Sequence, residues 1–320
     1  MLIDTLLLIA LPASGKSEVR TFLSTLTPEQ CASDFSLGET AQLDDYPYVH
    51  MMRRIDEELD AIGAPRLFFA AADRPFKDPI EWGTLIELLN EDYADLRAAR
   101  RPEPQSPAET LLARIDAARA ACGGAKLIAL LADDVRAKLV EGIANDARDL
   151  YAELRAAIPD SLDGRTVVIE FARGGAEGAS MPLEAPRGYA YSLSRLSDEI
   201  LSRASVLYIW VTPEESRRKN VERADPNDPG SILHHGVPEA VMRQEYGCDD
   251  IGYLVERAKT AGTVEVEAHG KTYVLPLARL DNRQDLTSFV RGDRDVWPEQ
   301  NVAALYGGLS EALTSLAKPR

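Results

Sequence analysis

Residues 10–17, Ala-Leu-Pro-Ala-Ser-Gly-Lys-Ser, combine small side chains with a lysine and a terminal hydroxyl. Phosphate oxygens need several backbone N–H donors at once, so a loop that binds them curls tightly and carries no bulky side chains. A lysine at position 16 can reach the β- and γ-phosphates of a nucleotide, and the hydroxyl at position 17 can bind Mg²⁺. The pattern predicts a nucleotide-binding loop that consists of Pro12, Ala13, Ser14, Gly15, Lys16 and Ser17.

The residues on either side give this loop a strand before it and a helix after it. Residues 6–9 are an apolar run, and Val19, Phe22 and Leu26 follow at helical spacing. The helix would add the positive end of its dipole. The whole stretch resembles the Walker A motif of P-loop NTPases, G-x-x-x-x-G-K-[ST], with Ala10 at the first glycine. Because a methyl group restricts the backbone, we expect Ala10 to affect loop geometry and affinity more than the existence of the site.

Two adjacent carboxylates, Asp44 and Asp45, follow a short predicted strand at residues 40–43. Ligands of open α/β sheets bind at the carboxyl ends of strands, beside the phosphate site. Either carboxylate could take a proton from a substrate hydroxyl or hold Mg²⁺ through water. The alternative is a polar turn before the helix that carries Met51, Met52, Ile55 and Leu59 on one face, with Arg53 and Arg54 beside them.

A second acidic strand end occurs in Arg165-Thr-Val-Val-Ile-Glu-Phe-Ala-Arg173. Its β-branched run is typical of a strand buried on both faces. The segment loosely resembles D-G-[FY]-P-R of nucleoside monophosphate kinases, with Glu170 at the acid and Arg173 at the arginine. The resemblance implies that Glu170 holds the water shell of Mg²⁺ and that Arg173 positions the acceptor. Otherwise these are ordinary surface charges at the end of a strand.

A basic helix follows the next buried strand, residues 205–211, and begins with the capping box Thr212-Pro-Glu-Glu215. In the resemblance to small-molecule P-loop kinases, this helix starts a lid at about residues 217–243. Its arginines, Arg217, Arg218 and Arg223, would stabilise charge on the transferring phosphoryl group. A solvated basic helix face is the alternative. The resemblance also implies contacts of Asp281 and Asn282 with the nucleotide base.

The order of these segments predicts an α/β fold: a parallel sheet of about five strands with helices on both faces. We expect the kinase-like core in residues 1–62 and 163–320, interrupted by a helical insertion at 63–162 that serves as a substrate cap or an interaction element. Within it, apolar periodicity predicts helices at 80–96 and 108–121 and a long helix over 128–158. Another helix is expected at 192–204, and a hairpin at 263–275.

Composition limits which kinds of protein this sequence can encode. A net charge of −16 disfavours a nucleic-acid surface. The three cysteines are widely spaced and indicate reduced thiols in a cytoplasmic protein. We expect no signal peptide and no membrane span, because the apolar N-terminus contains Asp4 and no apolar run is long enough. Nothing in the sequence specifies an oligomeric state.

The leading hypothesis is a Mg²⁺-dependent phosphotransferase that uses ATP, or another nucleoside triphosphate, on a small-molecule or nucleotide acceptor. Lys16 would bind phosphate, while Ser17 and Glu170 would hold Mg²⁺. The acceptor group is a hydroxyl if Asp44 or Asp45 is a base, and otherwise a phosphate. The alternatives are a nucleotide-dependent switch or scaffold that binds a partner through the helical insertion, and a toxin-like kinase of nucleotide sugars or RNA ends.

Overall fold

The sheet of this protein places its most apolar strand near the centre. The computed structural model describes residues 1–223 and 236–317, and in these ranges six strands form one sheet in the order β2-β3-β1-β4-β6-β5. Five strands are parallel, and β5 pairs with β6 in antiparallel orientation, which confirms the predicted α/β class and the hairpin. Their bounds are β1 (Thr5–Ile9), β2 (Glu39–Asp44), β3 (Arg165–Phe171), β4 (Ala204–Trp210), β5 (Thr263–Ala268) and β6 (Lys271–Asp281).

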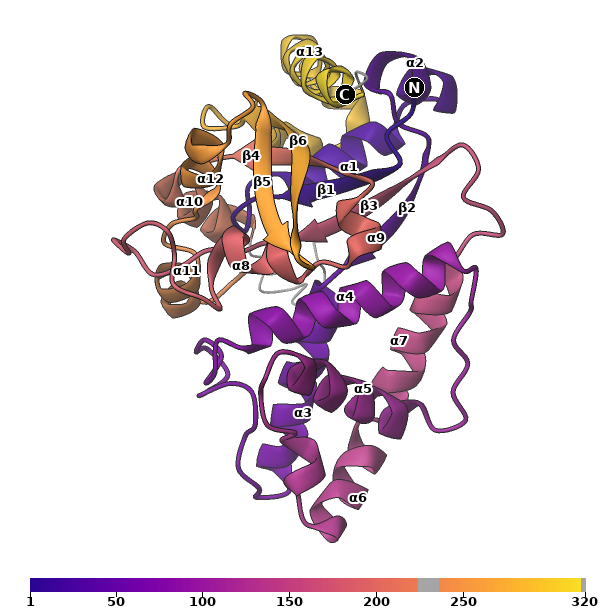
Figure 1. The fold of residues 1–320 in the computed structure, drawn as a ribbon, viewed down its shortest axis with the longest axis vertical. Coiled ribbons are helices and arrows are strands. Elements are labelled where there is room, and N and C mark those ends of the chain that lie inside the picture. Colours follow the sequence, from indigo (N-terminus) through magenta and orange to yellow (C-terminus); the bar gives the residue numbers. More distant parts are fainter. Residues whose placement is uncertain (224–235, 318–320) are drawn as a thin grey trace.

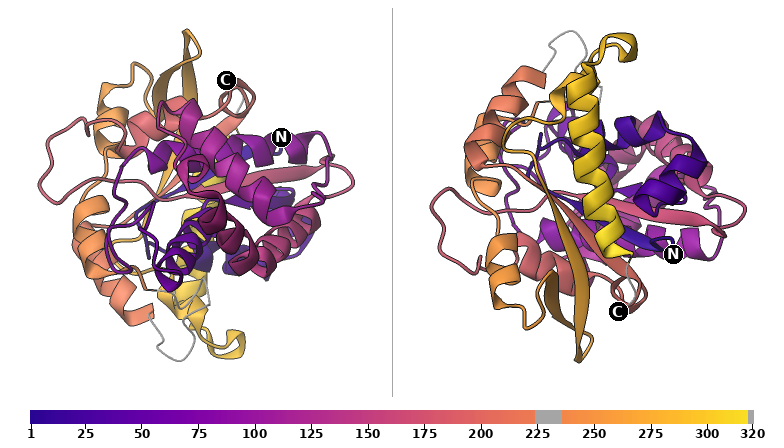
Figure 2. Two further views of the ribbon diagram at one scale, coloured as in Figure 1. Left: turned by 90° about the horizontal axis from the view of Figure 1, so that it is seen from below. Right: turned by 90° about the horizontal axis from the view of Figure 1, so that it is seen from above.

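Helices cover both faces of the sheet (Figures 1 and 2). Side chains of β1 alternate between the faces: Leu6 and Leu8 pack into one core, Leu7 and Ile9 into the other. The first core is covered by α1 (Lys16–Ser24), α2 (Pro28–Phe35) and α13 (Glu299–Leu316), and α13 crosses this face in the right view of Figure 2. The second is covered by α4 (Glu81–Arg97), α8 (Gly188–Arg195), α9 (Asp198–Leu201) and α12 (Ile251–Arg257).

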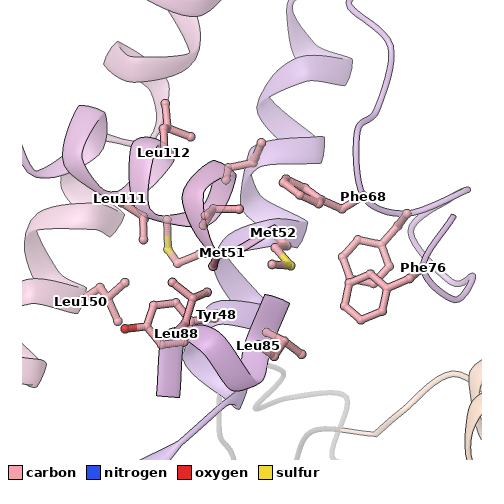
Figure 3. Close-up of a cluster of buried hydrophobic side chains, with 14 of the residues drawn as sticks. Tyr48, Met51, Met52, Phe68, Phe76, Leu85, Leu88, Leu111, Leu112 and Leu150 are labelled. Carbon is pink, nitrogen blue, oxygen red and sulfur yellow. The ribbon is translucent and has the colours of Figure 1, made fainter. Parts of the chain in front are cut away.

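A helical lobe lies beyond one end of the sheet (Figure 1) and has a hydrophobic core of its own (Figure 3). Met51, Leu88, Leu111 and Leu150 come from four different helices and meet there. The lobe consists of α3 (Tyr46–Ala61), α5 (Pro107–Ala121), α6 (Asp133–Gly142), α7 (Ala144–Ala157) and the near side of α4. The helix α3, which the sequence analysis grouped with the phosphate loop, therefore packs with the segment 63–162.

Two predicted helices are wrong in their bounds. The apolar pattern over 128–158 belongs to a 3₁₀ turn (Ile128–Leu130) and two helices, α6 and α7, that meet at Ile143. The pattern continues across the break because both helices present their apolar side to the same core. The helix expected at 192–204 is divided as well: α8 ends at Arg195, and Ser197 caps α9 by accepting from the Ile200 N–H at 3.3 Å.

Two short helices remain, α10 (Pro213–Arg223) and α11 (Glu239–Glu245). They enclose the part of the predicted lid that lies outside the described residues. Among the helices of the described ranges, none is both long enough and apolar enough to cross a bilayer.

Candidate functional site

The loop predicted to bind phosphate, residues 10–17, is held by side chains from three distant elements. Tyr189 donates its hydroxyl to the Ala10 carbonyl at 2.9 Å, Ser216 to Pro12 at 2.7 Å, and Asn282 donates Nδ2 to Ser14 at 2.7 Å. All three bonds satisfy carbonyl oxygens of the loop. By contrast, the backbone N–H groups at positions 14, 15 and 17 have no acceptor anywhere in the described part of the chain. The loop is therefore left with unsatisfied donors beside the positive end of α1, which is the polarity that an anion needs.

The loop bends at Ala13 and Gly15, whose φ angles are +54° and +103°. A Cβ atom on Gly15 would overlap Thr287 Oγ1 and lie 2.8 Å from Asn282 Nδ2, so this glycine is required by both conformation and space. Ala10 does not adopt a positive φ and is fully buried in the core. The backbone at position 10 therefore has no conformational need for glycine. The effect of the Ala10 methyl group on loop geometry and affinity stays a prediction.

A carboxylate cluster consisting of Asp44, Asp45 and Glu170 lies at the carboxyl ends of β2 and β3. The parallel register sets Asp44 directly beside Glu170, and Glu170 beside Leu8 of β1. Lys16 Nζ approaches Glu170 Oε1 to 4.0 Å, and Arg20, which the sequence analysis did not single out, donates to Glu170 Oε2 at 2.8 Å. Strand register thus brings residues from three separate segments to one edge of the sheet.

The proton affinity of Asp44 is strongly perturbed. Burial, followed by the negative charges of Glu170 and Asp45, raises the pKa of the Asp44 carboxyl to about 8. Arg20 lies 3.8 Å away and offsets only part of this effect. A carboxylate with such a pKa takes up a proton readily near neutral pH, as a general base must.

Asp45 and Arg173 form a buried ion pair at 2.5 Å. The guanidinium of Arg173 also donates to Ser192 Oγ at 3.1 Å and to the Ala172 carbonyl at 2.7 Å, and its side chain is 1% exposed. Burial raises the pKa of Asp45, and Arg173 opposes that rise. Arg173 does not line the pocket described below, so in this arrangement it positions Asp45 and does not contact an acceptor.

One pocket joins the phosphate loop, the carboxylate cluster and the helical lobe. Across from the loop lies an aromatic wall formed by Phe69, Phe76, Trp82 and Tyr246. Consecutive ring centroids in this wall are 4.5, 5.0 and 5.7 Å apart. The wall was missed from the sequence; its only signal was the short apolar run Leu67-Phe-Phe69, which fits no helical period. Arg53, which also lines the pocket, was noted only as lying beside the apolar face of its helix.

Asp56 explains how an irregular segment can form this wall. Its buried carboxylate accepts from the backbone N–H groups of Leu67 at 2.6 Å and Phe69 at 2.6 Å, and of Phe68 at 3.1 Å. These bonds fix the segment to α3. The wall thus depends on a carboxylate eleven to thirteen residues earlier in the chain.

Two of the predicted lid arginines, Arg217 and Arg218, do not line the pocket. Arg217 lies 3.5 Å from both Glu177 and Glu214, and Arg218 pairs with Glu215 at 2.6 Å on the surface. Arg223 is the last residue of α10. Residues 224–235 of the predicted lid lie outside the described residues, whereas α11 contributes Val241 and Glu245 to the pocket.

The predicted base-contacting residues also have other partners. Asp281 pairs with Arg283 at 2.7 Å on the surface. Asn282 is fully buried, donates to Ser14 and Thr287, and accepts from the Leu286 N–H at 2.6 Å. Asn282 therefore supports the loop through its hydrogen bond to the Ser14 carbonyl and does not line the pocket.

The residues predicted to hold Mg²⁺, Ser17 and Glu170, both line the pocket. Within residues 1–223 and 236–317, no group of three or more His, Cys, Asp or Glu side chains is arranged to hold a metal by itself. A hydroxyl and one or two carboxylates are a donor set that suits Mg²⁺ when nucleotide phosphates supply further oxygens. The residues fit a metal that arrives with a nucleotide.

Comparisons of this chain with protein-family models, with curated proteins and with solved structures give no match. The site geometry is therefore the basis for a function.

Proposed function

We propose that this protein is a Mg²⁺-dependent P-loop kinase that transfers the γ-phosphoryl group of ATP, or another nucleoside triphosphate, to a hydroxyl of a small acceptor. One observation carries the proposal: a loop with unsatisfied N–H groups and a carboxylate whose pKa is raised to about 8 line the same pocket as the aromatic wall. This pairing supports an acceptor next to the nucleotide phosphates.

Each of these residues has a separate role in the proposed reaction. The loop N–H groups and Lys16 bind the phosphates, and Ser17 with Glu170 holds the metal. MgATP supplies the phosphoryl group: a bond forms between the acceptor oxygen and the γ-phosphorus as the bond to the bridging oxygen breaks, which leaves MgADP. Asp44 takes up the proton of the acceptor hydroxyl. Asp45, tied to Arg173, keeps the start of α3 in place.

The five-stranded parallel core supports the resemblance to P-loop kinases, as does the position of the loop between a central strand and a helix. The aromatic wall supports an acceptor of low polarity, and this disfavours a bare nucleotide phosphate as the accepting group. Arg217 and Arg218 would reach the phosphates only after a movement of α10.

The experiment is phosphoryl transfer from γ-labelled ATP to a panel of small hydroxyl compounds, with calorimetry of MgATP binding in parallel. We expect binding and transfer in the parent and neither in Lys16→Ala. Arg54→Gln, a surface change on α3 away from the pocket, serves as the control. Slow hydrolysis that no acceptor accelerates would support the nucleotide-dependent switch and overturn the kinase; absence of any heat with MgATP would overturn both.

A further inference from the structure

Arg53 is a pocket residue whose charge is not balanced by a carboxylate. Its guanidinium lies 4.1 Å from the centroid of the Phe69 ring, and Nη1 donates to the Ala72 carbonyl at 2.6 Å. No ion pair links it to any acidic residue in the described ranges of the chain. Its neighbour Arg54, in contrast, pairs with Glu57, Glu58 and Asp146 at 2.7, 2.6 and 3.4 Å on the outer side of α3.

Glu57 lies on the same helix and its charge opposes the effect of burial on the Arg53 pKa, but it forms its ion pair with Arg54. Glu245, an acidic residue that lines the pocket, already has a cationic partner. Glu245 is 3% exposed and accepts from Trp82 Nε1 at 2.9 Å and from Arg187 at 3.3 Å. Partial burial lowers the pKa of the Arg53 guanidinium. Its positive charge is therefore less well solvated than it would be in water, which costs free energy. A ligand anion would supply the missing partner.

The helix α3 fixes where that anion would lie. Tyr46, Val49, His50 and Arg53 all line the pocket, at the spacing of one helical face. The stripe begins directly after Asp44 and Asp45, and from residue 46 to residue 53 the helix rises about 10 Å. A ligand that spans the pocket would thus place one end at Asp44 and the other at Arg53, with its middle against the aromatic wall.

We infer that the pocket takes a small ring-bearing hydroxy acid: a carboxylate or phosphate pairs with Arg53, the ring packs on Phe76, Trp82 and Tyr246, and the hydroxyl faces Asp44. The contacts of the anion and of the ring do not depend on the proposed kinase function. Only the role of the hydroxyl rests on that proposal. A hydroxyl of the ligand that faces the wall would lose water without gaining a partner there, so the wall favours an apolar ring over a fully polar one.

The test is calorimetric binding, without nucleotide, of three probes that share one ring: benzoate, phenyl phosphate and benzyl alcohol. We expect at least one anion to bind at least about tenfold more tightly than the alcohol, since a charge-assisted pair is worth that much. Arg53→Gln should remove this preference and Arg53→Lys should keep part of it, while Arg54→Gln behaves as the parent. The anion that binds more tightly indicates whether the ligand carries a carboxylate or a phosphate. The Lys16→Ala variant tests whether phenyl phosphate binds at the loop of residues 10–17 instead of at Arg53.

Equal binding of all three probes, no binding of either anion, or equal losses in Arg53→Gln and Arg54→Gln, would overturn the inference. Failure of the kinase function is recognised separately with 4-(hydroxymethyl)benzoate and 1,4-benzenedimethanol as acceptors. Arg53-dependent anion binding without any phosphoryl transfer refutes the kinase and leaves the acid site. Transfer to both acceptors with the same KM in the parent and in Arg53→Gln refutes the acid site and leaves the kinase.

Discussion

Replacing Arg173 with methionine tests whether the buried pair with Asp45 holds the site together. The substitution removes three close hydrogen bonds and leaves a buried carboxylate without its cation. Breaking one partner of such a pair costs about 3–5 kcal/mol of unfolding free energy. With Arg173 gone, only Lys16 still opposes the effect of burial, so the pKa of Asp45 rises further and the folded protein holds a proton that the unfolded chain releases above pH 3.8.

The sign of the pH dependence follows from that raised pKa. Stability of the variant falls as pH rises above about 4 and through the raised pKa of Asp45, so we expect a larger cost near pH 8 than near pH 5. Where the carboxyl is protonated, only lost hydrogen bonds remain, about 1–3 kcal/mol. Urea unfolding of variant and parent near both pH values measures this, because titration of groups far from the pair cancels in the difference.

The double variant Asp45→Asn/Arg173→Met is the matched control and should show almost no extra pH dependence. An Arg173→Met cost that is equal near pH 5 and near pH 8 would refute the reasoning, since the loss would then come from packing alone. A cost below about 1 kcal/mol at both would show that the pair is not buried as described.

The remaining predictions concern the loop and the base. Asp44→Asn should lower phosphoryl transfer about 10²- to 10⁴-fold and abolish the rise in kcat/KM as pH approaches 8; a parent rate that does not depend on pH from about 6 to 8 would exclude Asp44 as the base. Gly15→Ala should cost about 1–3 kcal/mol in thermal unfolding and weaken MgATP binding, whereas Gly63→Ala, with φ +73° but open space around it, should cost about 1 kcal/mol or less; equal costs would show that crowding by Thr287 is unimportant. Ala10→Gly should leave MgATP affinity within about twofold and cost about 1 kcal/mol of stability, and a large gain in affinity would mean that the methyl group does distort the loop.

The sequence alone determined the strand ends and the loop. Apolar runs in β1, β3 and β4 are long enough and β-branched or leucine-rich enough to be recognised locally, and the small residues before Lys16 restrict the chain to a tight turn. Glu170 was found because it ends such a run, and Asp44 because it follows the short predicted strand at residues 40–43. Their proximity could be expected from the rule that parallel strands share one carboxyl edge, and the register of β2 and β3 confirms it.

Tertiary structure alone decided which charged groups face a ligand. Arg173 follows the end of β3 and Arg53 lies in the middle of α3, and neither position shows from the sequence what the side chain contacts. The first is enclosed by Asp45 and Ser192, whereas the second lines the pocket without an ion pair to a carboxylate among the described residues. Whether an arginine is paired depends on residues more than a hundred positions away, as with Asp45 and Arg173. The aromatic wall also joins α4, α11 and an irregular loop, and no local periodicity encodes such a surface because its members share no secondary structure.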